Sequence, residues 1–358
     1  MIIYDLRTAI YETKRSMKSQ FKHAGLVLLL LSALNSQLST AHAQGSLTPP
    51  GAPAPTMKSL AQIEPRTPIS TAPFNISTSG SYYLTTNLTV SSGLAVSIAA
   101  SGVTLDLNGF TIASTEPSAT SFGIVIFGSS SDVAILHGHI RGGVTNNGSG
   151  TFSGPGFGYG IYGPTAKSVQ VTGVSVSGVL NYGIYLSQND ATLVESCTVR
   201  TTGSYGILAN TIKSSLALDC GNTAIYGNQI SDCRGECVNG FFAVNAVNAQ
   251  NCSGTSSSSY GLYANSAQNC YGSSSNSVGL YATSAQNCFG YSISSYGISA
   301  SLAQNCYGNS STGIGLAAQN ANTCMGYRPG GTAIQATVAN GCYANIGTNI
   351  ITYKYNMP

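Results

Sequence analysis

A small residue followed by an aliphatic one recurs along the chain and organises its hydrophobic and polar positions. The pair occurs as Gly160-Ile161, Gly183-Ile184, Gly206-Ile207, Ala224-Ile225, Ala243-Val244, Gly261-Leu262, Gly279-Leu280, Gly297-Ile298, Gly315-Leu316 and Ala333-Ile334. Its steps are 23, 23, 18 and 19 residues, and then 18 throughout. Repeats this short leave no room for a helix pair, and their Ser, Asn and Gly content disfavours helix. In YGIYL (182–186), alternation predicts a strand in which Ile184 points one way and Gly183 and Tyr185 point the other.

The register of this marker predicts coils that stack on one another. The aliphatic residues from Ile161 to Ile334 would form one inward ladder, and the residue two positions later is nearly always small. Burial of the same positions in every repeat is typical of a β-solenoid. A left-handed solenoid of hexapeptides needs an aliphatic residue at every sixth position, but Gln268 and Ser274 follow Leu262 at those intervals. We therefore predict an all-β chain, a single right-handed parallel β-helix of about twelve coils with 18 to 23 residues each.

Two stretches near the start of the repeats carry a resemblance to a known family. GVTLDLNGFTI (102–112) and DVAILHGHIRG (132–142) resemble the opening coils of secreted right-handed β-helix proteins of the pectin-lyase-like superfamily. The likeness covers roughly residues 80 to 345. These motifs consist of residues that pack coils, so the resemblance implies the fold and leaves the activity open. Pectate lyases hold calcium with carboxylates and use Arg or Lys as a base, and related hydrolases need two or three acids at a groove.

Cysteine follows the same period as the marker. Nine of the ten cysteines keep one of two offsets from it, which predicts one column of nine with only Cys237 outside. Strand spacing would hold neighbouring β-carbons about 4.8 Å apart, whereas a disulfide needs about 3.8 Å. We therefore predict a column of buried free thiols. Some bridges remain an alternative, and Cys233 with Cys237 is the pair most open to bridging. No His or second Cys accompanies each coil, so we predict no metal site and no cofactor.

Charge excludes one class of partner. Charged residues make up only 7% of the chain, and the formal charge is +3. Up to Ala43 there are five basic and two acidic residues, so the remainder carries nine of each sign and is neutral. Because no basic field remains, we predict no nucleic-acid partner.

The N-terminal residues predict secretion and a spacer. A basic segment precedes an apolar run of ten residues (25–34), and Ala41-His42-Ala43 fits the small-x-small cleavage rule. A membrane span needs about 20 apolar residues, so we predict a signal peptide at 1–43 and no membrane span after its cleavage. Seven of the twelve prolines lie between Pro49 and Pro73, which predicts a Pro-rich linker at 44–78 before a β-helix at 79–358.

Acid–base chemistry is confined to the first part of the repeats. Between Val238 and Pro358 the chain has no acid, and its only bases are Arg328 and Lys354. The last coils therefore cannot supply acid–base catalysis.

Earlier charged residues offer limited alternatives. His137-Gly138-His139, followed by Arg141, resembles a scrambled Gly-His-Gly of polygalacturonases without its acid pair, and we expect both histidines to face solvent. Asp219 and Asp232 flank the change in coil length, where a loop could bring them together; solvated loop charges are the alternative. The other charged residues that we considered are Arg234 and Glu236 in the same cluster, Asp106 as a turn residue, and Asp190 and Glu195 without a basic partner.

Binding has more support than catalysis. Five outward tyrosines follow the aliphatic ladder, interrupted by Leu208 and Asn245, and we call them the aromatic strip: Tyr162, Tyr185, Tyr226, Tyr263 and Tyr281. Such rings can stack on sugars, so we predict that they bind a ligand and share one face, each more than a third exposed. The alternative is a ladder that only stabilises the sheet. The insert Gly142–Gly158, with Phe152 and Phe157, is expected to project as a loop.

These observations predict a secreted β-helix rod that acts as a structural or carbohydrate-binding surface protein, with polysaccharide as its partner. The alternative is a polysaccharide lyase or glycoside hydrolase with its site on the longer N-terminal coils.

Overall fold

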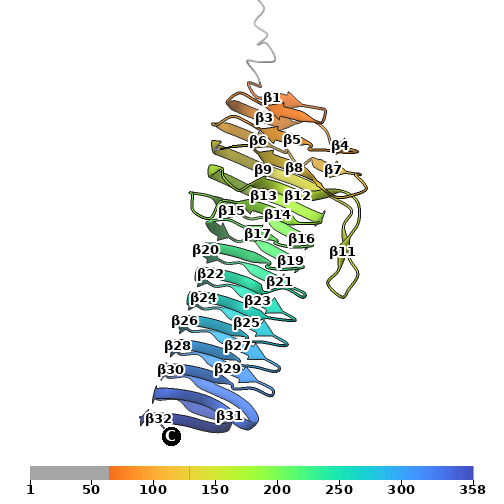
Figure 1. Cartoon of the computed structure of the whole chain (residues 1–358). Helices are drawn as coiled ribbons and strands as arrows, with labels where there is room; N and C mark the ends of the chain where they lie inside the picture. Colours follow the sequence, from red (N-terminus) through yellow and green to blue (C-terminus); the bar gives the residue numbers. More distant parts are fainter. Residues whose placement is uncertain (1–63, 129, 358) are drawn as a thin grey trace, which may run out of the picture. The chain divides into compact units, whose positions relative to one another are not determined.

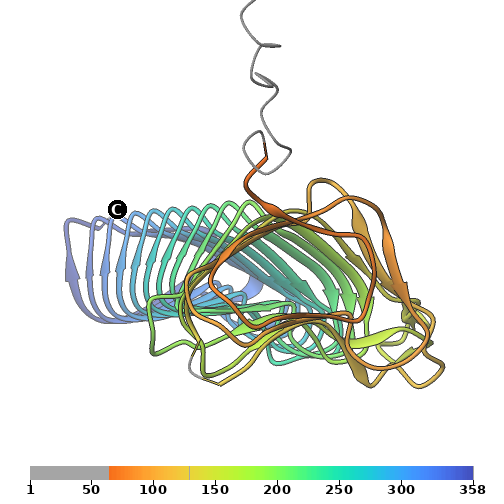
Figure 2. The same cartoon turned by 90° about the horizontal axis from the view of Figure 1, so that it is seen from above.

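A computed structural model describes residues 64–128 and 130–357, and the predicted signal peptide lies outside these residues. The residues from Glu64 onward form one compact unit of stacked coils (Figure 1). Seen along the stack in Figure 2, successive coils repeat a closed outline. Within the described residues, no helix is long and apolar enough to cross a membrane.

The regular elements of these coils are β-strands. The first coils contain β1 (Thr67–Ile69), β2 (Phe74–Ile76), β3 (Gly80–Leu84), β4 (Leu88–Val90), β5 (Val96–Ile98), β6 (Val103–Asp106), β7 (Thr111–Ser114), β8 (Ser121–Ile126), β9 (Ser131–Arg141), β10 (Thr145–Asn146) and β11 (Phe152–Ser153). The middle coils contain β12 (Phe157–Gly163), β13 (Lys167–Val179), β14 (Tyr182–Leu186), β15 (Leu193–Glu195), β16 (Thr198–Thr202), β17 (Ile207–Leu208), β18 (Thr211–Lys213), β19 (Leu216–Cys220), β20 (Ile225–Ser231) and β21 (Arg234–Cys237). The last coils contain β22 (Phe242–Gln250), β23 (Ser253–Ser256), β24 (Tyr260–Gln268), β25 (Tyr271–Ser274), β26 (Leu280–Gln286), β27 (Phe289–Ser292), β28 (Ile298–Gln304), β29 (Tyr307–Ser310), β30 (Leu316–Asn322), β31 (Met325–Asn340) and β32 (Tyr343–Tyr355).

Parallel pairing between successive coils confirms the predicted fold and register. Ile161 pairs with Ile184 and Ile184 with Ile207, which are steps of 23 residues, whereas Leu262 pairs with Leu280 after 18. This pairing is consistent with the right-handed parallel β-helix predicted from the sequence.

Paired strands begin before the boundary expected at residue 79. Thr67 in β1 pairs in parallel with Tyr82 in β3, and Phe74 in β2 pairs with Val96 in β5. The end of the segment expected to be linker is thus already part of the coils, because TPI and FNI alternate with a buried isoleucine at their ends.

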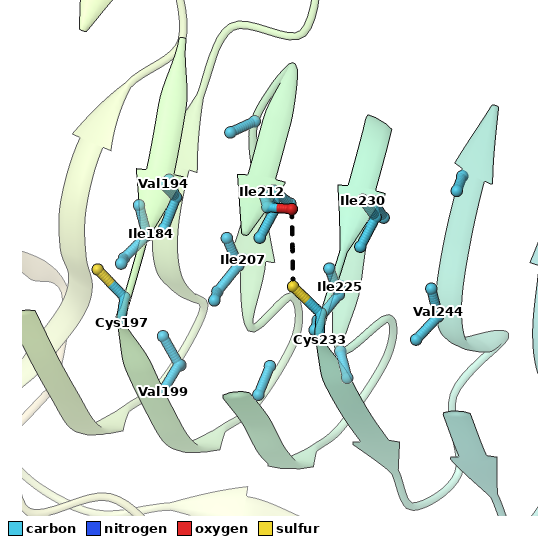
Figure 3. Close-up of a cluster of buried hydrophobic side chains, with 14 of the residues drawn as sticks. Ile184, Val194, Cys197, Val199, Ile207, Ile212, Ile225, Ile230, Cys233 and Val244 are labelled. Carbon is cyan, nitrogen blue, oxygen red and sulfur yellow. Dashed lines mark hydrogen bonds between the residues drawn. The ribbon is translucent and has the colours of Figure 1, made fainter. Parts of the chain in front are cut away.

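The core is a set of in-register side chains that point into the coils (Figure 3). Ile184, Ile207, Leu262 and Leu280 are each 0% exposed, so the predicted inward ladder is confirmed. Gly183 does not point outward with Tyr185 as simple alternation predicted. A β-carbon on Gly183 would lie 2.4 Å from Cγ1 of Val199 on the opposite wall, because the chain turns a corner there with two consecutive residues inward.

The interior narrows toward the C-terminal coils. One inward column changes from β-branched residues to alanine, in the order Val194, Ile212, Ile230, Ala249 and Ala267. Another changes to glycine, in the order Val199, Ala217, Gly235, Gly254 and Gly272. A β-carbon on Gly272 would lie 2.2 Å from the carbonyl oxygen of Gly279, so the facing walls of an 18-residue coil leave no space for a side chain.

The predicted single column of nine cysteines is wrong at one position, although all ten cysteines are free and buried. Cys220 lies in a second column, where it pairs with Thr202 and Cys237. Ser215 takes its place in the main column: its hydroxyl donates to the carbonyl of Lys213 at 2.7 Å, as the thiol of Cys233 donates to that of Ser231 at 3.0 Å. Equal offsets from the marker misled the prediction because the long coils carry their extra residues before this column.

Candidate functional site

The aromatic strip lies on one face of one sheet. Tyr162 pairs with Tyr185 in the next coil, and Tyr263 pairs with Tyr281. Leu208 and Asn245 occupy the same register column on either side of Tyr226. The structure therefore brings the five tyrosines into one line along the stack.

A second column of aromatic rings lies beside the strip. We define the N-terminal ring cluster as Phe122, Tyr159, Tyr162, Tyr182, Tyr185, Tyr205 and Tyr226. Tyr182 stacks on Tyr185 with ring centroids 4.7 Å apart, and Tyr205 stacks on Tyr226 at 6.3 Å. Burial raises the pKa of the Tyr182 phenol, and the neighbouring phenols raise it further.

The same arrangement recurs farther along the sheet. We define the C-terminal ring cluster as Phe241, Phe242, Tyr260, Tyr263 and Tyr281. The rings of Tyr263 and Tyr281 are nearly parallel, at 5° and 4.9 Å. Phe241 is the most open member, with 65% of its surface exposed.

Rings that stack on one another cover each other's faces. All five strip tyrosines are half-buried, and none is in the exposed class that was expected for free rings. Ring faces are open where the register neighbour is not aromatic: Ser299 follows Tyr281, and Asn245 separates Tyr226 from Tyr263. The strip therefore offers ring edges and hydroxyl groups along its length, and ring faces at these breaks.

An apolar pocket of about 220 Å³ marks the N-terminal end of the strip. Phe122 and Tyr162 line one side of it, and Phe127, Val125 and Pro164 line the rest. Phe127 is 48% exposed. An apolar sugar face or a methyl substituent would be desolvated here.

Sequence reasoning missed the second ring column. Its residues Tyr159, Tyr182, Tyr205 and Tyr260 each stand two positions before the aliphatic residue of the marker. This constant offset was a signal that could have identified them. Strict alternation placed them away from the strip, but the corner at the marker glycine brings both columns together.

The acidic cluster is not assembled as predicted. Asp219 and Asp232 lie at opposite ends of the strands that contain them or follow them, β19 and β21. Asp232 accepts a hydrogen bond from Asn251 at 3.0 Å. Asp219 instead shares a pocket of about 360 Å³ with Glu236.

Both carboxylates of that pocket are engaged. Asp219 accepts hydrogen bonds from Asn146 at 2.6 Å and from Thr201 at 2.8 Å. Glu236 forms an ion pair with Arg234. Within the described residues, no group of three or more His, Cys, Asp or Glu side chains is arranged to hold a metal ion.

The insert Gly142–Gly158 forms a hairpin that contacts the following coils rather than projecting freely. Its strands β10 and β11 pair antiparallel, and Figure 1 shows the hairpin alongside the stack. A β-carbon on Gly221 would lie 2.9 Å from the Phe152 ring, and Phe157 is fully buried. Asn239 donates to the carbonyl of Ser149.

The histidines face solvent, as expected. Nδ1 of His137 lies 3.6 Å from Asp106, whose carboxylate also accepts the backbone N–H of Asn108 at 2.9 Å and pairs with Arg66 at 3.3 Å. Asp106 therefore stabilises a turn, and His139 is exposed without joining an acid pair.

Comparisons with known proteins show distant likenesses. No protein-family model and no curated protein matches the sequence. Tailspike protein 2 of the Escherichia coli O157:H7 bacteriophage CAB120 is similar over 78% of this chain and 37% of its own, with 15% identity and a TM-score of 0.32. The Dettilon tailspike protein is similar over 81% of this chain and 61% of its own, with 14% identity and a TM-score of 0.34. The Streptococcus pneumoniae surface protein and adhesin PfbA is similar over 79% of this chain and 89% of its own, with 10% identity and a TM-score of 0.25. The chain thus spans less than two thirds of either tailspike.

Proposed function

We propose that this chain is a secreted β-helix protein that binds polysaccharide along the aromatic strip. One observation carries the proposal: two continuous ring clusters lie in line on the outer face of one sheet, with open ring faces at their breaks. Isolated aromatic residues on a surface need no explanation, but a contiguous patch of them is typical of a binding surface.

The chemistry of the strip suits a sugar polymer. A tyrosine ring offers an apolar face or edge together with a hydroxyl group, and a sugar ring presents C–H groups beside hydroxyls. The sheet spaces its rings regularly at about 4.8 Å, so an extended chain would contact several of them at once. Each contact is weak, and retention would depend on their number.

A structural ladder and an enzyme are the competing interpretations. Ring stacking along the strip also stabilises the sheet, by roughly 0.2–1 kcal/mol for each cross-strand pair. The lyase or hydrolase alternative has one specific observation in its favour, namely the pocket that Asp219 and Glu236 share. A general acid must carry a proton at the working pH, whereas charged partners and hydrogen bonds to a carboxylate favour its ionised form.

The test is retention of the mature protein in gels that contain polysaccharides, together with an assay for newly formed chain ends. The Tyr162→Ala/Tyr185→Ala variant should be retained at least about threefold less than the parent, since each aromatic contact contributes about 0.5–1.5 kcal/mol. Tyr291→Ala is the matched control, because Tyr291 is half-buried on β27 in another sheet.

Equal retention of the Tyr162→Ala/Tyr185→Ala variant and the parent would overturn binding by the strip. New chain ends that disappear in Glu236→Gln, with retention preserved, would establish the enzyme instead.

A further inference from the structure

A shallow groove of about 570 Å³ lies on a different part of the coils from the aromatic strip. We call it the amide–aromatic groove. One wall is a column of asparagines at the turn before each cysteine, and the other is a column of aromatic residues directly after each cysteine. Its walls consist of Asn251, Asn269, Asn287 and Asn305 on one side and Ser253, Tyr271, Phe289 and Tyr307 on the other.

The repeated segment Ala-Gln-Asn-Cys-aromatic-Gly builds this groove. In the coil of Cys270, the residues Ala267, Cys270 and Gly272 are buried, while Asn269 and Tyr271 are exposed. Asn269 has φ of 54°, in the left-handed region that asparagine tolerates better than most residues. The turn therefore places an amide and a ring on the same side of every coil.

The amide wall has hydrogen-bonding capacity to spare. Asn269 donates to Asn251 at 3.2 Å and accepts from Asn287 at 3.2 Å, and Asn305 donates to Asn287 at 3.3 Å. An asparagine side chain has two N–H donors and two acceptor sites. Each amide within the ladder thus keeps one donor and one acceptor for a ligand, and the ladder itself fixes their orientation.

The aromatic wall offers a ring face at one end. Tyr271 stacks on Phe289 with centroids 5.4 Å apart and an interplanar angle of 5°, and Phe289 contacts Tyr307 at 5.1 Å. On the other side of Tyr271, the register neighbour is Ser253, whose small side chain leaves that ring face open. Tyr271 is 37% exposed.

Charge and length identify the occupant. The lining contains no charged side chain, and from Val238 to the last residue the chain has no acid and only Arg328 and Lys354 as bases. An anionic or cationic polymer would find no counter-charge there. The lining spans four coils from Asn251 to Tyr307, which exceeds what one sugar unit covers.

We propose that the amide–aromatic groove is a second polysaccharide site, which binds one neutral, linear chain along the coil axis. The amides donate to and accept from sugar hydroxyls, and the open face of Tyr271 stacks on one sugar ring. This site goes beyond the function proposed above, because it shares no residue with the aromatic strip and either site can exist without the other.

The test is affinity electrophoresis of the full mature chain in gels cast with hydroxyethyl cellulose, galactomannan or polygalacturonate. Tyr271→Ala/Phe289→Ala removes the two stacked rings, and Asn287→Gly removes one amide while keeping a residue that adopts positive φ. Gly341 already occupies the equivalent position before Cys342, with φ of 60°. Tyr291→Ala is the control, because Tyr291 lies on the same strand as Phe289 and outside the groove lining.

The expected result is retention of the parent by at least one neutral polymer. The Tyr271→Ala/Phe289→Ala variant should bind that polymer about tenfold more weakly, and Asn287→Gly about threefold more weakly, with Tyr291→Ala unchanged. Circular dichroism and the thermal midpoint identify variants that fail to fold, and Asn287→Gly then decides the outcome.

Retention of both groove variants equal to the parent would overturn the proposal, as would retention by polygalacturonate alone. A changed oligomeric state of the double variant with unchanged retention would assign the groove to contacts between copies and also overturn it. If Tyr162→Ala/Tyr185→Ala alone loses retention, the groove proposal fails and the strip proposal stands; loss in the groove variants alone gives the reverse.

Discussion

Replacing Gly272 by Ala probes whether the width of the 18-residue coil dictates its glycine column. The new β-carbon would lie 2.2 Å from the carbonyl oxygen of Gly279 and 2.9 Å from the β-carbon of Leu280. The first of these atoms belongs to the backbone of the opposite wall, so the wall itself must shift. Overpacking of this kind costs about 1–3 kcal/mol, and the loss of glycine flexibility in the unfolded chain offsets about 0.4–1 kcal/mol. We expect a net loss of about 1–2 kcal/mol.

Urea unfolding followed by circular dichroism measures this change, because the midpoint falls while the slope stays constant when only stability changes. Ser273→Ala is the matched control on the same strand, where Ser273 is half-buried on the outer side. Its free energy of unfolding should stay within about 0.5 kcal/mol of the parent. A Gly272→Ala variant as stable as the parent would refute the argument that facing walls exclude a side chain.

Three other perturbations test the packing. A thiol reagent should label all ten cysteines in the denatured, unreduced protein and none in the native protein, since all ten are buried and free; four or five disulfides by mass would contradict this. Asn287→Ala should be roughly 1 kcal/mol less stable in urea than Asn287→Gly, because a β-carbon is costly at φ of 53°; the reverse order would refute the role of the turn. Burial raises the pKa of the Cys233 thiol from 9.0 to about 11, so the unfolded chain loses this proton first. This contribution to stability is complete below about pH 9 and is lost between pH 9 and 11. A thermal midpoint that falls as steeply in Cys233→Ala as in the parent would exclude the thiol as a cause.

The sequence predicted the fold well because one register governs all coils. A marker that repeats every 18 or 23 residues fixes which side chains are inward, and Ile184 and Leu280 are fully buried as expected. Departures arose where the chain turns a corner. Period-two alternation assumes a straight strand, so it failed at Gly183 and hid the ring column that contains Tyr182.

The candidate site was only partly predictable. The line of strip tyrosines follows from the register, but their mutual stacking and limited exposure depend on side-chain geometry that no repeat encodes. Asp219 was expected beside Asp232, and the hairpin residue Asn146 contacts it instead. A contact between residues 73 positions apart cannot be inferred from local pattern.

Footprinting of tyrosines tests the central claim most directly. The chain contains no tryptophan, and its 21 tyrosines can be modified by radical oxidation and located by mass spectrometry. With a retained polysaccharide at saturation, modification should fall at Tyr162, Tyr185, Tyr226, Tyr263 and Tyr281, while exposed Tyr296 and Tyr353 react as before. Unchanged modification of the five strip tyrosines, under conditions in which the polymer is bound, would contradict the account.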